Sequence, residues 1–168
     1  ERGLKGLTAR DLGARLGADV PFCLSGGLAH VGGLGEKITA LPGAPSIPLA
    51  MVTPGGGLST PAVFREFDGG GDPFGALDAS ALAAALCAGD LDRAQSLSLN
   101  SLEPAAIRLM PEIGEAMRRI RELGARFVRM TGSGSTVFAA FETPEQAAHA
   151  AAQLEGAIAT CSLGEGQS

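Results

Sequence analysis

The sequence predicts an α+β domain in which an antiparallel sheet carries helices on one face. Short apolar runs bounded by turn residues indicate strands, a block of helices separates an early strand from the later ones, and two strands follow each other directly late in the chain. The expected order is two strands, a strand, helices, two strands, a helix and a strand. That order is typical of α+β domains, since no regular alternation of strand and helix and no internal repeat is visible.

The first expected helix covers residues 8–16. Thr8 is a suitable N-cap, Asp11 is acidic in the first turn, and Gly17 can end the helix. The chain begins at Glu1, without an initiator methionine or a strand ahead of this helix. A complete domain and a segment of a longer protein both remain open on these residues.

Asp19 follows the first helix, in a stretch of small and apolar residues. Because a residue before proline is biased away from the helical region, Pro21 predicts an extended Val20 and a helix-to-strand junction at Asp19. A carboxylate in that place is either a turn aspartate bonded to its own backbone or a residue of a functional site. Both interpretations remain open at this point.

Residues 23–41 are expected to form two strands with glycine-rich bends. Gly32, Gly33 and Gly35 are not followed by Gly-Lys-Ser/Thr, and no strand-to-helix step carries a dinucleotide fingerprint. A bulged hairpin is therefore expected here instead of a phosphate loop, because glycine marks bulges and bends. The Pro-Gly-Ala-Pro turn at 42–45 is the best domain boundary in the chain.

The second part is expected to open on a strand at 47–52. A helix follows, capped by Ser59 or Thr60 with Pro61 in its first turn, and a Gly/Asp loop is expected at 68–73. The later predicted elements are helices at 78–86 and 90–99, one or two helices within 104–123, strands at 126–130 and 137–141, a helix at 145–154 and a strand at 157–163.

A loop of small residues at 131–135 leads directly into one of these strands. Gly132 and Gly134, with Ser133 between them, allow a ligand to approach the backbone because no Cβ blocks it. Successive amides in such a loop can also form an anion-binding nest. A tight turn between two strands needs glycine equally, so these residues alone favour neither reading.

Composition excludes several classes of partner. The net charge is −5 and the longest basic cluster is Arg118-Arg119, which argues against a nucleic-acid interface. No apolar run approaches the roughly 20 residues that span a bilayer. The three cysteines, Cys23, Cys87 and Cys161, are odd in number and lack paired spacing. They predict reduced thiols of a cytoplasmic protein and argue against a zinc site or a disulfide framework.

Five motifs in order resemble the GHMP kinase superfamily. They are Leu-Gly-Ala-Asp-Val-Pro-Phe at 16–22, Gly-Leu-Gly-Glu at 33–36, Ser-Thr-Pro-Ala-Val-Phe at 59–64, Asn-Ser-Leu-Glu at 100–103 and Thr-Gly-Ser-Gly at 131–134. The resemblance extends from about residue 7 to residue 163. It implies a remnant of the N-terminal GHMP domain at 1–44, a C-terminal GHMP domain at 45–163 and a disordered tail at 164–168.

The resemblance is to the branch that phosphorylates the 2-hydroxyl of a cytidine-bearing methylerythritol in non-mevalonate isoprenoid synthesis, with ATP and Mg²⁺. It implies that Asp19 is the catalytic base and that Phe64 stacks on the cytosine ring. Without the resemblance, Phe64 would be assigned to the core of its helix. The substrate-binding positions that it implies are Thr60, Pro61, Phe64, Gly132, Ser133 and Gly134.

Departures from the family pattern set the expected limits of this chain. The family's nucleotide loop, Pro-x-x-x-Gly-Leu-Gly-Gly-Gly-Ser-Ser, is absent, as are an orienting lysine and a second aromatic residue for the cytosine. We therefore expect the C-terminal part of a kinase, without cofactor-binding residues or metal ligands of its own, inactive without its missing N-terminal half. Two alternatives remain: a non-catalytic cytidine-binding module, and another GHMP enzyme such as a homoserine, mevalonate or galactose kinase. The Thr60-Pro61-x-x-Phe64 pattern favours the cytidine-recognising branch over the latter.

Overall fold

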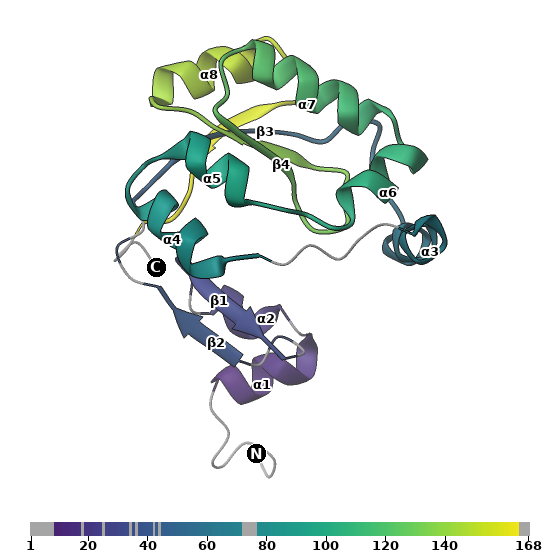
Figure 1. The fold of residues 1–168 in the computed structure, drawn as a ribbon, viewed down its shortest axis with the longest axis vertical. Helices are drawn as coiled ribbons and strands as arrows, with labels where there is room; N and C mark the ends of the chain where they lie inside the picture. The colour runs from purple at the N-terminus through teal and green to yellow at the C-terminus, as the bar shows by residue number, and fades with distance from the viewer. Residues whose placement is uncertain are drawn as a thin grey trace. The chain divides into compact units, whose positions relative to one another are not determined.

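The computed structural model describes residues 9–17, 19–24, 26–33, 35, 37–41, 43, 45–71 and 77–164 (Figure 1). The chain divides into two compact units, one of residues 1–46 with 163–168 and the other of residues 47–162. The assignment of these units to an N-terminal and a C-terminal GHMP domain stays a prediction. The disordered tail at 164–168 also stays a prediction. Thr8, the predicted helix cap, lies outside the described residues.

The first unit contains two helices and a hairpin among its described residues. Helix α1 covers Ala9–Leu16 and α2 covers Val20–Cys23, and they are followed by strands β1, Ala29–Gly32, and β2, Lys37–Ala40. The strands pair antiparallel in one continuous register, from Ala29 opposite Ala40 to Gly32 opposite Lys37. The predicted hairpin is therefore confirmed, although its register is not interrupted by a bulge.

The prediction of an extended Val20 is wrong, because α2 begins at that residue. Pro21 lies in the first turn of α2, where a backbone N–H has no acceptor within the helix. The donor that proline lacks is therefore not missed, and its fixed φ suits the turn. Asp19 consequently lies between two helices and not at a helix-to-strand junction, and Cys23 ends a helix instead of belonging to a strand.

The second unit is built on a four-stranded sheet in the order β4-β5-β3-β6, in which every neighbouring pair is antiparallel. Strand β3 covers Pro48–Val52, β4 Phe127–Met130, β5 Val137–Ala140 and β6 Ile158–Cys161. One strand, a block of helices, two strands, a helix and a last strand follow each other along the chain. This is the ferredoxin-like split βαβ arrangement, and it confirms the predicted α+β class.

The helices of this unit begin and end close to the predicted positions. They are α3 Thr60–Gly70, α4 Ala79–Cys87, α5 Leu91–Leu97, α6 Glu103–Leu109, α7 Glu112–Glu122 and α8 Pro144–Ala152. The loop predicted at 68–73 is wrong over residues 68–70, which continue α3 until Gly71 ends it at φ +65°. Glycine at that position adopts the left-handed conformation without steric cost, as in many helix C-caps. Residues 72–76 lie outside the described part of the chain.

Alternating strand residues divide the core into two layers. Val128 and Met130 belong to the larger cluster, together with apolar residues of α7 and α8 such as Ile120. Phe127 faces the opposite way and packs with residues of α4 and α5 such as Leu91. In Figure 1, α7 and α8 lie together over the sheet. The helical layer expected on one face is thus present, and the pair α4 and α5 adds a smaller layer on the other.

Candidate functional site

Two groups of predicted site residues meet in the second unit. Helix α3 begins at Thr60, with Ser59 as N-cap and Pro61 in the first turn, and the loop 131–136 joins the neighbouring strands β4 and β5. The Thr60 Oγ1 and Ser133 Oγ atoms lie 2.8 Å apart in a hydrogen bond in which either hydroxyl can donate. The fold therefore brings together two motifs that are 73 residues apart in the chain.

The loop is closed by its own backbone and tied to the turn after β3. The Thr131 N–H donates to Thr136 O at 2.9 Å, and the Gly134 N–H donates to Thr131 O at 3.0 Å. The Ser135 hydroxyl donates to the carbonyl oxygen of Gly56 and is 2% exposed. A buried hydroxyl needs such a partner, so this bond fixes the end of the loop at a definite place.

The two glycines of the loop are required for different reasons. Gly134 has φ +93°, and a Cβ there would lie 2.8 Å from Met130 Sδ and 3.3 Å from Leu58 Cδ1. Gly132 also has a positive φ, +56°, but a Cβ there would meet nothing within 4 Å. Gly134 is therefore needed for packing, whereas Gly132 leaves its backbone accessible. The close approach of a ligand, expected of both, suits Gly132.

Phe64 lies one helical turn after Thr60 on α3, hence on the same face of the helix. Its side chain is 49% exposed, whereas Phe67 of the same helix is 5% exposed and belongs to the core. Thr60 and Pro61 are exposed as well. The reading of Phe64 as a core residue is therefore wrong, and an accessible aromatic ring stands close to the hydroxyl pair.

Asp19 is exposed and belongs to the first unit, whereas the other six predicted site residues belong to the second. It is the N-cap residue of α2, but its side chain makes no capping hydrogen bond. The bonds expected of a turn aspartate capping its own backbone are therefore not formed. Its assignment as a catalytic base stays a prediction.

Sequence reasoning missed two residues that contact the loop. The Asn100 side-chain amide donates to Met130 O and to Gly132 O, each at 2.9 Å. A carboxylate oxygen of Glu103 accepts the Met130 N–H at 2.9 Å. Both residues belong to the Asn-Ser-Leu-Glu motif at 100–103, so the signal was present in the sequence but no contact could be assigned to it.

Two arginines, Arg129 within β4 and Arg126 just before it, bind residues of α5 and its C-cap. The Arg129 guanidinium donates to the carbonyls of Gln95 and Ser98 at the end of α5, and burial lowers the pKa of Arg129. Arg126 donates to Asp92 on α5 and holds the pKa of that carboxyl below its usual value, chiefly through the hydrogen bond. These contacts fix α5 against β4.

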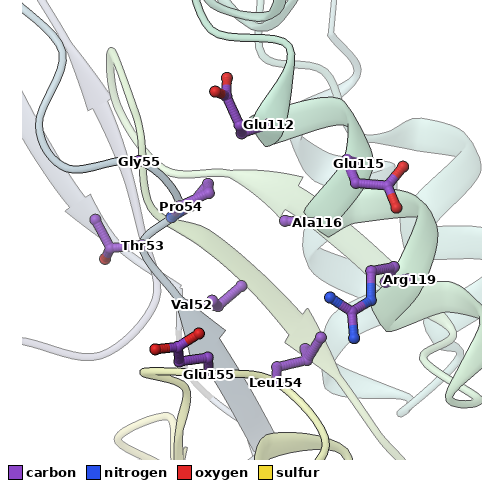
Figure 2. A pocket seen from close by; sticks show the side chains of 10 residues that line it. All are labelled: Val52, Thr53, Pro54, Gly55, Glu112, Glu115, Ala116, Arg119, Leu154 and Glu155. Carbon is purple, nitrogen blue, oxygen red and sulfur yellow. The ribbon is translucent and has the colours of Figure 1, made fainter.

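A cavity of about 420 Å³ lies between the end of β3 and α7 (Figure 2). Its charged lining residues are three carboxylates, Glu112, Glu115 and Glu155, against one guanidinium, Arg119. A lining of net negative charge repels phosphates, so this cavity does not suit a polyphosphate ligand. The lining contains none of the predicted site residues.

A second cavity, of about 530 Å³, lies against the loop from the side of α4 and the α5–α6 connection. Asn100, Thr131 and Gly132 line it together with apolar side chains such as Leu82 and Phe138. It therefore reaches the beginning of the loop but not α3.

Within the part of the chain that the structure describes, no three His, Cys, Asp or Glu side chains form a group able to hold a metal ion. Among the described residues, Cys23, Cys87 and Cys161 form no disulfide bond. None of the described helices has the length and apolar character needed to cross a membrane.

The family model of the GHMP kinases C-terminal region matches residues 82–159, which extend from α4 into β6. A kinase of Granulibacter bethesdensis named 4-diphosphocytidyl-2-C-methyl-D-erythritol kinase is 43% identical over 141 residues, which are 83% of this chain and 45% of the relative. The chain is similar to the C-terminal part of GHMP kinases. It spans about half the length of the curated relatives it matches.

Two solved kinase structures agree with the fold. A crystal structure of 4-(cytidine 5'-diphospho)-2C-methyl-D-erythritol kinase superposes with a TM-score of 0.79 at 37% identity, over 95% of this chain and 59% of that one. Homoserine kinase from Cytophaga hutchinsonii superposes with a TM-score of 0.66 at 20% identity, over 86% of this chain and 50% of that one. The second likeness concerns the fold alone.

Proposed function

We propose that this chain is the C-terminal part of a kinase that phosphorylates the 2-hydroxyl of 4-diphosphocytidyl-2-C-methyl-D-erythritol in non-mevalonate isoprenoid synthesis. The observation that carries the proposal is the Thr60–Ser133 hydroxyl pair at 2.8 Å. It joins the two motifs assigned to the substrate pocket, next to the exposed ring of Phe64. The name shared by the matched relatives supports the same substrate.

In this proposal the cytosine ring stacks on Phe64, and Thr60 and Pro61 line the pocket beside it. Stacking a base on an aromatic side chain contributes roughly 1–3 kcal/mol to the binding free energy. The exposed ring of Phe64 therefore makes a sizeable contribution to substrate affinity in this proposal. Gly132, Ser133 and Gly134 position the substrate and its phosphates with their backbone. The open space at Gly132 supports this role.

Asp19 is the proposed catalytic base. Its carboxylate takes the proton of the 2-hydroxyl as that oxygen bonds to the γ-phosphorus of ATP, and the bond between the γ-phosphorus and the bridging oxygen breaks to release ADP. Phosphoryl transfer depends mainly on alignment and charge stabilisation, with a base to accept the proton. An exposed carboxylate that makes no capping bond is available for that transfer.

ATP and Mg²⁺ are the proposed phosphoryl donor and its metal ion. The ion would neutralise charge on the transferred phosphoryl group, but the described residues form no cluster to hold it, and none is assigned as its ligand. The nucleotide loop is proposed to lie in the N-terminal half of a longer protein, absent from this chain. The cytoplasmic location inferred from the cysteine pattern remains part of the proposal.

The test begins with the coding sequence upstream of Glu1 in the source genome. An in-frame extension that encodes the glycine-serine nucleotide loop and an early lysine supports the proposal, and a stop codon or an unrelated sequence contradicts it. The intact protein should release ADP in the presence of the cytidylyl substrate and not with homoserine, mevalonate or galactose. A preference for one of these three would assign the chain to another GHMP kinase.

The chain of 168 residues should show no substrate-dependent ATP turnover above background when assayed alone. Substrate-dependent turnover by this chain would contradict its assignment as an incomplete kinase. Saturable binding of the cytidylyl substrate by an intact protein that hydrolyses no ATP would instead support a cytidine-binding module. Isothermal titration calorimetry beside an ADP-release assay distinguishes these cases.

A further inference from the structure

Asn100 lies in the connection between α5 and α6 and is not one of the residues assigned to substrate. We infer that Asn100 is a positioning residue, which orients the peptide between Gly132 and Ser133 so that the Ser133 N–H is presented to the substrate's phosphates. The kinetic part of this inference rests on the proposed function. Its structural part, that Asn100 holds the loop, does not.

The side-chain amide of Asn100 makes three hydrogen bonds. Its nitrogen donates to Met130 O and Gly132 O, both at 2.9 Å, and its oxygen accepts the Leu102 N–H at 3.0 Å. The Leu102 bond fixes which end of the amide is oxygen, so the nitrogen must face the two loop carbonyls. Among side chains of this size, only asparagine supplies two donors and an acceptor in this arrangement.

The first residue of α6, Glu103, binds the other polar group of the Met130 backbone. Glu103 accepts the Met130 N–H at 2.9 Å, while Asn100 binds its carbonyl. Met130 forms the last register pair of β4 with β5, opposite Val137. The two side chains therefore hold the chain at the point where the strand ends and the loop begins.

Holding a carbonyl also determines where the next N–H points. In a planar trans peptide the C=O and the following N–H point in opposite directions. The Met130 carbonyl points to Asn100, and the next N–H, that of Thr131, donates to Thr136 on the other side. The Gly132 carbonyl also points to Asn100, so the Ser133 N–H must point away from it.

The Ser133 N–H is therefore a directed donor. It donates to no backbone carbonyl among the described residues, and its own hydroxyl already pairs with Thr60. A backbone N–H held in advance binds a phosphate oxygen without further reorganisation. The open space at Gly132 leaves room for that oxygen to approach.

Asn100→Asp is the sharpest variant, because aspartate has the same shape but places a carboxylate oxygen against two carbonyls. In the intact protein, kcat/KM for the cytidylyl substrate should fall roughly 10- to 100-fold, as expected for the loss of hydrogen bonds of about 1–3 kcal/mol. The KM for ATP should change less than about twofold. Asn100→Ala, which removes the donors without adding charge, should give the same pattern if Asn100→Asp fails to fold.

Gln153→Glu is the matched control, because it makes the same amide-to-acid change at an exposed position at the end of α8. It should behave like the wild type. Hydrogen–deuterium exchange on the 168-residue chain gives a readout that needs no activity. The Thr131 and Gly134 amides, both hydrogen-bonded inside the loop, should exchange at least about tenfold faster in Asn100→Asp and Asn100→Ala and be unaffected in Gln153→Glu.

Unchanged exchange in the loop would show that Asn100 does not hold it and would overturn the inference. Faster exchange with unchanged kcat/KM in an active enzyme would also overturn it, because the orientation of the Ser133 N–H would then not matter to the substrate. A wild-type intact protein that does not act on the cytidylyl substrate overturns the proposed function and with it the kinetic part. The exchange data then still decide whether Asn100 holds the loop.

Discussion

The proposed base, Asp19, and the loop at 131–135, which we call the substrate wall, differ in how firmly hydrogen bonds hold them. Asp19 is exposed. It occupies the N-cap position of the four-residue helix α2, but its side chain makes no hydrogen bond to that helix. The loop at 131–135 is bonded at its beginning by Asn100, in its middle by Thr60 and at its end by the Gly56 carbonyl. Substrate positioning demands a fixed geometry, whereas a base has to keep its carboxylate free for a proton. The difference therefore separates recognition from proton transfer.

Asp19→Asn in the intact protein tests one side of this difference and should have the largest effect. The amide cannot accept the proton of the 2-hydroxyl, so kcat should fall about 10²- to 10⁴-fold. The free energy of unfolding should stay within about 0.5 kcal/mol of wild type, because the side chain is exposed and makes no capping bond. Steady-state kinetics and urea denaturation measure the two quantities.

Glu155→Gln supplies the matched control for that variant. It neutralises a carboxylate of the acidic cavity in Figure 2, which we do not assign to substrate, and should leave kcat unchanged. An equal loss of rate in both variants would attribute the effect to net charge and remove Asp19 from the role of base. A large loss of folding stability in Asp19→Asn would contradict the claim that Asp19, unlike the loop, makes no stabilising side-chain bond.

Two phenylalanines of α3 should distinguish a loss of substrate binding from a loss of folding stability. Phe67→Ala removes a side chain that is 5% exposed and should lower the free energy of unfolding by about 3–5 kcal/mol. Phe64→Ala removes a ring that is 49% exposed and should cost about 1 kcal/mol of stability or less. It should instead weaken binding of the cytidylyl substrate by roughly 1–3 kcal/mol through lost stacking.

Urea denaturation of this chain and calorimetric titration of the intact protein check the pair. If Phe64→Ala lowers the free energy of unfolding as much as Phe67→Ala does, Phe64 contributes to the core and its assignment to the substrate pocket loses support. Unchanged substrate affinity in Phe64→Ala would remove the ring from the pocket and weaken the preference for a cytidine-bearing substrate.

The two loop glycines provide a finer comparison. Gly134→Ala places a Cβ at 2.8 Å from Met130 Sδ at φ +93° and should destabilise the fold by about 2–4 kcal/mol. Gly132→Ala meets no neighbour within 4 Å and is strained only through φ +56°, so about 1–2 kcal/mol is expected. Chemical denaturation measures both. Equal losses would show that packing against Met130 adds nothing.

The sequence predicted the elements whose signals are local. Pro61 after Ser59 marked the start of α3, and the glycines at 32–35 marked the hairpin. Val20 was missed because two local rules conflict there. The bias against helix before proline favoured an extended residue, and the tolerance of proline in a first helical turn outweighed that bias.

The contacts that build the candidate site could not be predicted from local patterns. Asn100 and Gly132 are 32 residues apart, and Thr60 and Ser133 are 73 apart. Such pairs are set by the strand order β4-β5-β3-β6 and by the placement of α3 and α6, which depend on packing over the whole unit. The exposure of Phe64 was undetermined for the same reason, since its burial depends on what the other helices cover.

Acid should weaken the attachment of α5 to the residue that precedes β4, through the ion pair between them. Arg126 donates to Asp92 and lowers the pKa of that carboxyl below its ordinary value of 3.8. A carboxyl whose pKa is depressed by folding adds stability above its unfolded pKa, and this stability is lost as the pH falls through the folded value. The difference in free energy of unfolding between wild type and Asp92→Asn, measured in urea, should therefore be constant from about pH 7 to pH 5 and should shrink below about pH 4. Because both side chains are exposed, the effect is the smallest of those expected here. A difference that persists unchanged to pH 2 would show that Asp92 acts through packing instead of charge.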